Sequence, residues 1–249
     1  MIQDIHSHSY YSFCGNDDPS VMVETAIAAG IEVYGICDHN YGICYGRRSI
    51  FKCDSEIPEE DYEKTLIRYY DHISLLREKY KDSIRLLCGV EVCTSLLRSR
   101  VALPRQTDIS FFDYCLIENV DLFENSVTGG DLIGYAKSLG CPAGVAHTDL
   151  FKFIQKRGDD PYDYLCRMAD AGIFWEMNVN YDATDRYIEH QYVKDFFASE
   201  EQQELVRRSG LRLSVGFDCH RASEYLGERV INACQKLEEI KIPTVNFVR

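Results

Sequence analysis

Short apolar runs alternate with longer amphipathic stretches along most of this chain. In the amphipathic stretches, apolar residues recur every three or four positions, which is the spacing of one helix face. The run at residues 84–92 is apolar at successive positions, as is typical of a parallel strand that is buried on both faces. The pattern predicts strands at residues 1–5, 31–37, 84–92, 114–120, 143–146, 173–178 and 212–217.

Start and stop signals bound the helices between these strands. Asp18 precedes Pro19, an order that suits the cap and first turn of a helix that ends at Gly30. No periodicity marks residues 40–58, which we expect to form a long loop, and residues 96–110 are ambiguous. Helices are predicted at about residues 19–29, 59–80, 131–139, 162–171, 185–209 and 223–237, with a short edge strand at 242–248.

The alternation of strand and helix favours a parallel sheet covered by helices. Seven such repeats exceed what a doubly wound sheet usually needs. Polar residues also follow nearly every strand, which favours a closed or nearly closed barrel. Neither a linker nor an internal repeat interrupts the pattern, so we expect residues 1–249 to form a single barrel domain.

The amino-acid composition indicates which kinds of partner the protein can bind. With 45% hydrophobic and 27% charged residues, the 249-residue chain resembles an ordinary globular protein. Its 40 acidic residues against 27 Lys and Arg give a formal net charge of −13, which argues against nucleic-acid polymers as partners. Bound metal cations would invert the charge locally, so a small anionic substrate is compatible with this composition.

The 11 cysteines indicate reduced thiols in a cytoplasmic protein. Their number is odd, no two are spaced as Cys-x-x-Cys, and several lie inside apolar runs. The first residues include Asp4 and lack a basic, then apolar, leader. No apolar run approaches the length that crosses a membrane, so we expect no membrane partner.

Two histidines, His6 and His8, follow the first predicted strand. Alternate residues of an extended chain point to the same side, so both imidazoles can bind one ion. Asp4 could orient one of these rings. Taken alone, a His-x-His pair more often consists of two hydrogen-bonded or exposed histidines.

Four later strands are also followed by ligand-type residues. In a parallel barrel the carboxyl ends of all strands meet on one face, where active sites lie. Five of the seven histidines in the chain occupy such strand ends, which indicates a metal site rather than chance. The later residues of this set are His39, Glu91, His147, Asp218 and His220.

The complete set, in this order, resembles the polymerase and histidinol phosphatase (PHP) superfamily over essentially the whole chain. The resemblance implies a distorted (β/α)7 TIM-like barrel with up to three metal ions at its mouth, and hydrolysis of phosphoric ester bonds. It implies that one metal, through which catalysis occurs, is bound by His6, His8, Glu91 and Asp218. Glu91 would bridge to a second metal with His147, and His39 and His220 would hold a third.

Two positions depart from the family pattern. Where the third metal usually has another histidine, this chain has Cys14. A thiolate binds zinc well, but Cys14 can equally be a loop thiol beside a lost or weak site. A segment like residues 117–121 usually ends in histidine, and here it ends in Asp121, which we expect to be a ligand better suited to manganese, magnesium or iron.

Loop cations are candidates for binding a substrate phosphate. Arg47 and Arg48 are the best placed, because they lie in the predicted loop just after His39. His72 and His190 lie off the apolar stripe or among charges, so we expect both to be solvated. Weaker candidates are Arg100, Arg105, Lys152, Arg157, Asn178 and Asn180, and Asp149 can be a supporting group or a helix cap.

These observations favour a metal-dependent hydrolase acting on phosphoric esters. The preferred substrate is a small phosphorylated metabolite, a phosphomonoester as in histidinol phosphatases, attacked by a metal-bound hydroxide with two or three zinc, manganese or iron ions. A nuclease or nucleotide phosphodiesterase is the first alternative. A non-catalytic metal-binding regulatory domain is the second, favoured by the two departures from the family pattern.

Overall fold

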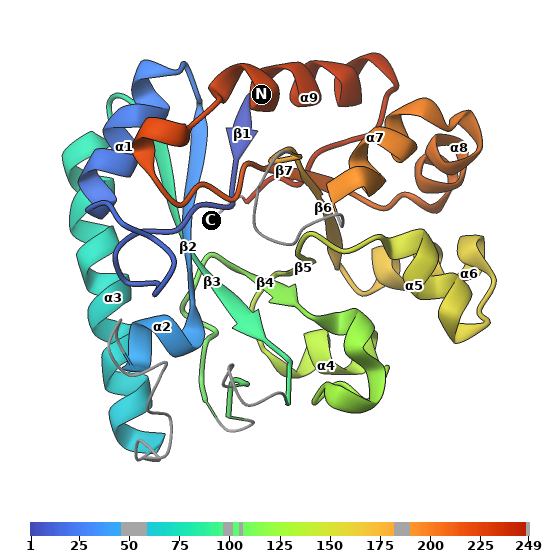
Figure 1. Ribbon diagram of the computed structural model, residues 1–249, viewed down its shortest axis with the longest axis horizontal. Coiled ribbons are helices and arrows are strands. Elements are labelled where there is room, and N and C mark those ends of the chain that lie inside the picture. The colour runs from blue at the N-terminus through green and yellow to red at the C-terminus, as the bar shows by residue number, and fades with distance from the viewer. Residues whose placement is uncertain (46–58, 97–101, 105–106, 182–189, 248–249) are drawn as a thin grey trace.

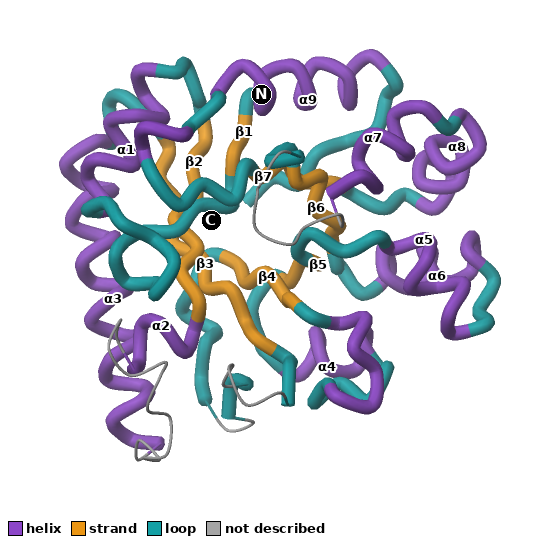
Figure 2. Tube along the Cα trace, viewed as in Figure 1, coloured by secondary structure: helices purple, strands orange, loops and turns teal. Residues whose placement is uncertain are grey.

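Seven parallel strands lie side by side in chain order, with helices outside them (Figure 1; Figure 2). The computed structural model describes residues 1–45, 59–96, 102–104, 107–181 and 190–247. The strands are β1 (Gln3–Asp4), β2 (Val33–His39), β3 (Arg85–Cys93), β4 (Tyr114–Glu118), β5 (Ala143–Val145), β6 (Phe174–Asn178) and β7 (Leu213–Gly216).

The two edges of this sheet, β1 and β7, come together through backbone hydrogen bonds. The amide of Ile5 donates to the carbonyl oxygen of Val215 at 3.0 Å. Just beyond the strands, the amide of Asp218 donates to the carbonyl oxygen of His6 at 2.7 Å. The sheet is therefore a nearly closed barrel, which confirms the predicted distorted (β/α)7 architecture.

Asp4 stabilises this closure. Its carboxylate accepts hydrogen bonds from the amides of His6 at 3.2 Å and Phe217 at 3.0 Å, and from the hydroxyl of Tyr225 at 2.8 Å. Burial raises the pKa of Asp4 to about 7, although these hydrogen bonds act to lower it. The expectation that Asp4 orients a metal-binding ring is wrong, because the carboxylate bonds to backbone amides and a tyrosine.

The helices form the outer layer of the barrel (Figure 2). Asp18 caps the first by accepting from the amide of Ser20 at 2.8 Å, as the sequence predicted. No helix among the described residues is both long and apolar enough to cross a lipid bilayer. The helices are α1 (Pro19–Ala28), α2 (Asn40–Tyr45), α3 (Glu59–Tyr80), α4 (Leu132–Ser138), α5 (Leu150–Arg157), α6 (Pro161–Asp170), α7 (Gln191–Ala198), α8 (Glu200–Ser209) and α9 (Gly227–Glu239).

Three segments differ from the predicted elements. The expected loop after β2 begins with α2, and its residues 46–58 lie outside the described part of the chain. The helix α5 follows β5, where Asp149 caps it by accepting from the amide of Lys152 at 3.0 Å. Of the single helix expected at 185–209, residues 185–189 lie outside the described part of the chain, and the rest contains the pair α7 and α8, which meet at Ser199. Both halves carry the same apolar period, so the pattern could not show this break.

Inward-facing side chains change character along the barrel. The apolar ones form a cluster, which Val245 and Phe247 of the carboxyl-terminal tail join. Within residues 242–247, which the structure describes, the tail pairs with Leu213 of β7 through an isolated bridge at Thr244, in place of the edge strand expected at 242–248. The apolar cluster consists of Ile5, Val33, Cys37, Leu87, Tyr114, Leu116, Ala146 and Phe174. Buried polar side chains lie toward the carboxyl ends of the strands.

Two strand glycines accommodate the ring of Tyr114 inside the barrel. A Cβ atom at Gly89 would lie 2.3 Å from a ring carbon of Tyr114, and one at Gly35 would lie 2.2 Å from its hydroxyl oxygen. That hydroxyl donates to the carbonyl oxygen of Ile5 at 2.5 Å. The ring is therefore enclosed on two sides by backbone.

We expect Gly89→Ala to lower the free energy of unfolding by about 3 kcal/mol, because the added methyl group displaces the Tyr114 ring in a close-packed interior. Tyr114→Phe, which keeps the ring and loses one hydrogen bond, should cost about 1 kcal/mol. Urea denaturation of both variants measures the difference. Equal stability of Gly89→Ala and the unaltered protein would contradict this packing argument.

Candidate metal centre

Imidazoles and carboxylates from every strand of the barrel meet at its carboxyl end. Their positions follow from the two-residue period of the strands, which points alternate side chains inward, and from the turns just after β1, β5 and β7. Most are buried, and His147 and His220 are half-buried. The set consists of His6, His8, His39, Glu91, Glu118, His147, Glu176, Asp218 and His220.

Glu176, at the inner face of β6, orients the first histidine. Its Oε1 lies 2.7 Å from Nδ1 of His6, and its Oε2 accepts from the backbone amide of His147 at 2.7 Å. A carboxylate accepts the Nδ1 proton, so Nε2 of His6 is left to face the centre. Sequence reasoning missed Glu176, although an acidic residue at an inward position of an apolar strand is the available signal.

His8 is held in a similar way by Ser12. The Nδ1 of His8 lies 3.1 Å from the hydroxyl oxygen of Ser12, which also accepts from the amide of His39 at 2.9 Å. The Nε2 of His8 lies 3.2 Å from Nε2 of His6 and 3.0 Å from Oδ1 of Asp218. Two ring nitrogens and a carboxylate oxygen therefore converge on one point.

Glu91 lies at the middle of the set. Its Oε1 is 3.0 Å from Nε2 of His147 and 3.5 Å from Nε2 of His6. Its Oε2 is 2.8 Å from Nδ1 of His39 and 3.4 Å from Nε2 of His8. Burial acts to raise the pKa of Glu91, but the charges of His39 and His6 hold it well below its usual range. A carboxylate with one oxygen toward each of two histidine pairs has the arrangement of a bridging ligand.

Several of these buried atoms lack a hydrogen-bond partner in the described part of the chain, namely Nδ1 of His39, Oε2 of Glu91 and Oδ1 of Asp218. Their nearest neighbours are other potential ligand atoms of the set, at 2.8 Å between Nδ1 of His39 and Oε2 of Glu91 and at 3.0 Å between Nε2 of His8 and Oδ1 of Asp218. Buried polar atoms rarely lack a hydrogen-bond partner, and a cation bound between these three atoms would interact with all of them. Potential ligand atoms within 4.8 Å of one another form four groups: His6, His8 and Asp218; His8, His39 and Glu91; Glu91, Glu118 and His147; and His8, Cys14 and His220.

At the fourth strand the structure brings Glu118 into the centre in place of the expected Asp121. Oε1 of Glu118 lies 3.4 Å from Nδ1 of His39. Asp121 is exposed on a 3₁₀ helix, Val120–Asn125, and belongs to none of the four groups. The reason is Asn119, whose left-handed backbone (φ 63°) turns the chain away from the barrel directly after Glu118.

His190 is buried against the centre, so the expectation that it is solvated is wrong. Only 1% of its surface is exposed, and its ring centroid lies 5.8 Å from that of His147. Its Nδ1 donates to the carbonyl oxygen of Asn180 at 2.8 Å. Burial, and then the charge of His147, lower the pKa of His190. The charged residues beside it in the sequence concealed this inward position.

The other predicted residues lie elsewhere or in supporting roles. His72 is half-buried, with Nδ1 2.9 Å from the hydroxyl oxygen of Tyr11, so it too is not simply solvated. Lys152 pairs with Asp149 at 2.9 Å, and Arg157 pairs with Asp159 at 2.7 Å, both on or beside α5. The predicted phosphate-binding residues Arg47, Arg48, Arg100 and Arg105 lie outside the described residues.

Asn178 is the remaining polar candidate at the mouth. It ends β6 on the same inward face as Glu176 and is buried. Its Oδ1 accepts from the amide of Asn180 at 3.2 Å. Its Nδ2 has no hydrogen-bond partner among the described residues, so it is a donor available to a bound anion.

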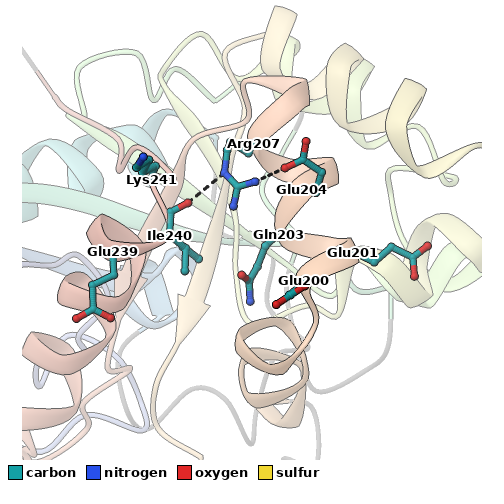
Figure 3. A pocket seen from close by; sticks show the side chains of 8 residues that line it. All are labelled: Glu200, Glu201, Gln203, Glu204, Arg207, Glu239, Ile240 and Lys241. Atoms are coloured by element: carbon teal, nitrogen blue, oxygen red, sulfur yellow. Dashed lines mark hydrogen bonds and ion pairs between the residues drawn. The ribbon is translucent and has the colours of Figure 1, made fainter.

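A groove of about 760 Å³ lies apart from this centre, between α8 and the end of α9 (Figure 3). Arg207 spans it, donating to the carbonyl oxygen of Ile240 at 3.1 Å and pairing with Glu204. The four glutamates that line the groove are exposed, as is usual for a solvated surface. Among the described residues, therefore, the barrel mouth offers the chemistry and this groove does not.

Comparison with protein families matches the PHP domain to residues 4–220. Among curated proteins, the histidinol-phosphatase of Lactococcus lactis subsp. lactis (strain IL1403) is 26% identical over 113 residues. That match covers 45% of this chain and 37% of the relative, so it spans well under two thirds of the relative's length.

Two solved structures share the fold. One is histidinol phosphate phosphatase from Lactococcus lactis subsp. lactis Il1403, in complex with zinc, L-histidinol and phosphate. It has a TM-score of 0.62 and 15% identity, over 98% of this chain and 95% of that one. The other is the putative histidinol phosphatase of Listeria monocytogenes, with a TM-score of 0.51 and 12% identity over 89% and 96% of the two chains.

Proposed function

This chain belongs to the PHP domain family, as its histidine and carboxylate motifs predicted, and from that premise we propose that it is a metal-dependent phosphoesterase. The observation that carries the proposal is the convergence of buried imidazoles and carboxylates at one barrel mouth, with ligand atoms of His39, Glu91 and Asp218 left without hydrogen-bond partners among the described residues. The donor set of nitrogen and oxygen atoms suits divalent zinc, manganese or iron.

The residues divide between two ion positions that share Glu91. One would be bound by His6, His8, Glu91 and Asp218, and the second by Glu91, Glu118 and His147. Divalent ions held here would stabilise charge on phosphate oxygens and lower the pKa of coordinated water. Their positive charge would also draw a phosphate to a protein whose formal net charge is −13.

The protein's own groups prepare this site. Glu176 and Ser12 hold Nδ1 of His6 and His8, so that each ring presents Nε2. Burial opposes ionisation of Asp218, but His6 and then His220 hold the pKa of Asp218 well below its usual range. The amide nitrogen of Asn178 is a donor suited to a phosphate oxygen.

We infer that the substrate is the phosphomonoester of a small metabolite. Among the solved structures that share this fold, one is a histidinol phosphate phosphatase that holds zinc, L-histidinol and phosphate, and another is described as a putative histidinol phosphatase. The acidic surface does not favour a nucleic-acid polymer. Histidinol phosphate is therefore the first compound to test.

The experiment compares ester classes with the metal-loaded full chain. Histidinol phosphate, a panel of other phosphomonoesters, a bis-aryl phosphodiester and a single-stranded oligonucleotide are each supplied with zinc, manganese or iron. We expect phosphate release from monoesters and none after chelation. Cleavage confined to the diester or the oligonucleotide would overturn the monoester proposal, and no turnover with any metal would overturn the enzyme proposal.

Glu176→Gln should lower kcat/KM by about 10- to 100-fold while the protein stays folded, because it weakens the hydrogen bond that orients His6 and sets its proton position. The glutamine can still accept from the amide of His147, which limits structural damage. Glu224→Gln, at an exposed glutamate that pairs with Arg221, is the matched control. Equal activity of the two variants would show that Glu176 has no part in orienting the ligand.

A further inference from the structure

Cys14 lies at the edge of the candidate metal centre, in the loop between β1 and α1. Its sulfur belongs to one of the four groups of potential ligand atoms, with His8 and His220. The side chain is half-buried, and no disulfide involves it. The thiol therefore sits among imidazoles at the mouth and not in the apolar layer that holds Cys37 and Cys88.

The loop that carries this thiol is fixed from both sides. The carboxylate of Asp38 accepts from the amide and hydroxyl of Ser9, at 2.8 Å and 2.6 Å, and from the amide of Ser12 at 3.0 Å. After the thiol, the amide of Asn16 donates to the carbonyl oxygen of His220 at 3.0 Å. These bonds hold Cys14 beside His220 before any ligand arrives.

The close approach of the backbone adds to this restraint. A Cβ atom at Gly15 would lie 2.0 Å from the carbonyl oxygen of Ser9, so only glycine allows the loop to fold back here. The loop therefore holds Cys14 in a fixed position beside the candidate metal centre.

The surroundings of Cys14 are polar. The side chains of His39 and His220 lie within hydrogen-bonding reach of its thiol. Cys37 and Cys88 instead lie in the apolar clusters of the core.

We propose that Cys14 is a thiolate ligand of a third ion, held with His220 in the group that His8, Cys14 and His220 form, and that this position selects zinc, iron or cobalt over manganese. The inference rests on the proposed metal-dependent function and adds to it a sulfur ligand in a cluster otherwise lined by nitrogen and oxygen. Thiolates favour softer ions, whereas carboxylates suit manganese and magnesium. The mouth would therefore hold ions of more than one kind when both are available.

The test is a cobalt titration of the chelator-treated full chain. A thiolate bound to Co²⁺ gives a sulfur-to-metal charge-transfer band in the near ultraviolet, which nitrogen and oxygen ligands do not give. We expect this band in the unaltered protein and its loss in Cys14→Ser and in Cys14→His. Cys14→His supplies an imidazole, so it should keep the same number of bound ions while losing the band.

Cys219→Ala is the control, because Cys219 lies next to His220 in the chain but donates to the carbonyl oxygen of Arg221 and packs in the outer core. This variant should keep the band. Zinc should also protect Cys14 from alkylation by iodoacetamide, as measured by peptide mass spectrometry, and manganese should not.

The outcomes separate this inference from the proposed function. Metal-dependent hydrolysis without a charge-transfer band, or a band that survives in Cys14→Ser, would overturn thiolate ligation and leave the phosphoesterase standing. Equal protection of Cys14 by manganese and zinc would overturn the selectivity. A band without hydrolysis of any ester would support the sulfur ligand and overturn the enzyme.

Discussion

Replacing His8 with alanine is expected to abolish phosphomonoester hydrolysis while the barrel stays folded. Three of the four groups of potential ligands include His8, so its loss affects most of the centre at once. Metal-based stabilisation of transition-state charge amounts to several kcal/mol, so we expect kcat/KM to fall by at least about 10³-fold. Elemental analysis of the purified variant should show fewer bound ions per chain.

His72→Ala is the matched control for this variant. His72 is a half-buried histidine on α3, hydrogen-bonded to Tyr11 and absent from the four ligand groups. It should retain activity and metal content, and circular dichroism should show both variants folded. Full turnover by His8→Ala would show that the assigned centre is not the site of the reaction.

Removing the metal is expected to lower the melting temperature by about 10 °C at neutral pH. Ions present at a thousandfold excess over Kd stabilise the folded state by about 4 kcal/mol, and each kcal/mol shifts the midpoint by about 2–4 °C for a chain of this size. Thermal denaturation with and without a chelator measures the shift. Identical curves would mean that the folded protein binds no ion at the mouth.

The metal-free protein should also lose stability as the pH rises. Although burial acts to lower it, hydrogen bonding and the charge of Glu91 raise the pKa of His147 from 6.5 to about 9. A raised pKa stabilises the folded state below pH 6.5, and this contribution disappears as the pH rises through about 9. In the metal-loaded protein the same nitrogen binds an ion, so the decline should be absent and the two curves should diverge between pH 6.5 and 9.

Much of this centre was predictable because strand ends are visible in sequence. His6, His8, His39, Glu91 and Asp218 each follow or end a short apolar run, and a parallel barrel brings such positions together. The same rule explains why the barrel itself could be predicted. The period of the apolar residues shows which side chains point into the barrel. The inward-pointing side chains near the strand ends form the candidate metal centre.

The errors have a different origin. The choice between Glu118 and Asp121 depends on the left-handed backbone of Asn119, which no spacing rule reveals. Glu176 was missed although it lies inside β6 as Glu91 lies inside β3, and its acidic side chain in an apolar strand was the available signal. His190 was missed because its neighbours in the sequence are charged. Asp4 was predicted to orient a histidine ring, but its carboxylate instead accepts from backbone amides that the closed barrel brings to it.

The closure of the barrel through Asp4 also sets an order of events during folding. Asp4 and Phe217 lie 213 residues apart, and their bond joins the strands that carry His6 and Asp218. Contacts across so long a loop form slowly, because the entropy of closing the loop precedes any gain from the contact. We therefore expect the group of His6, His8 and Asp218 to form only when β7 docks beside β1. An ion that needs this group would then bind late in folding, and its rate of binding would follow the completion of the barrel.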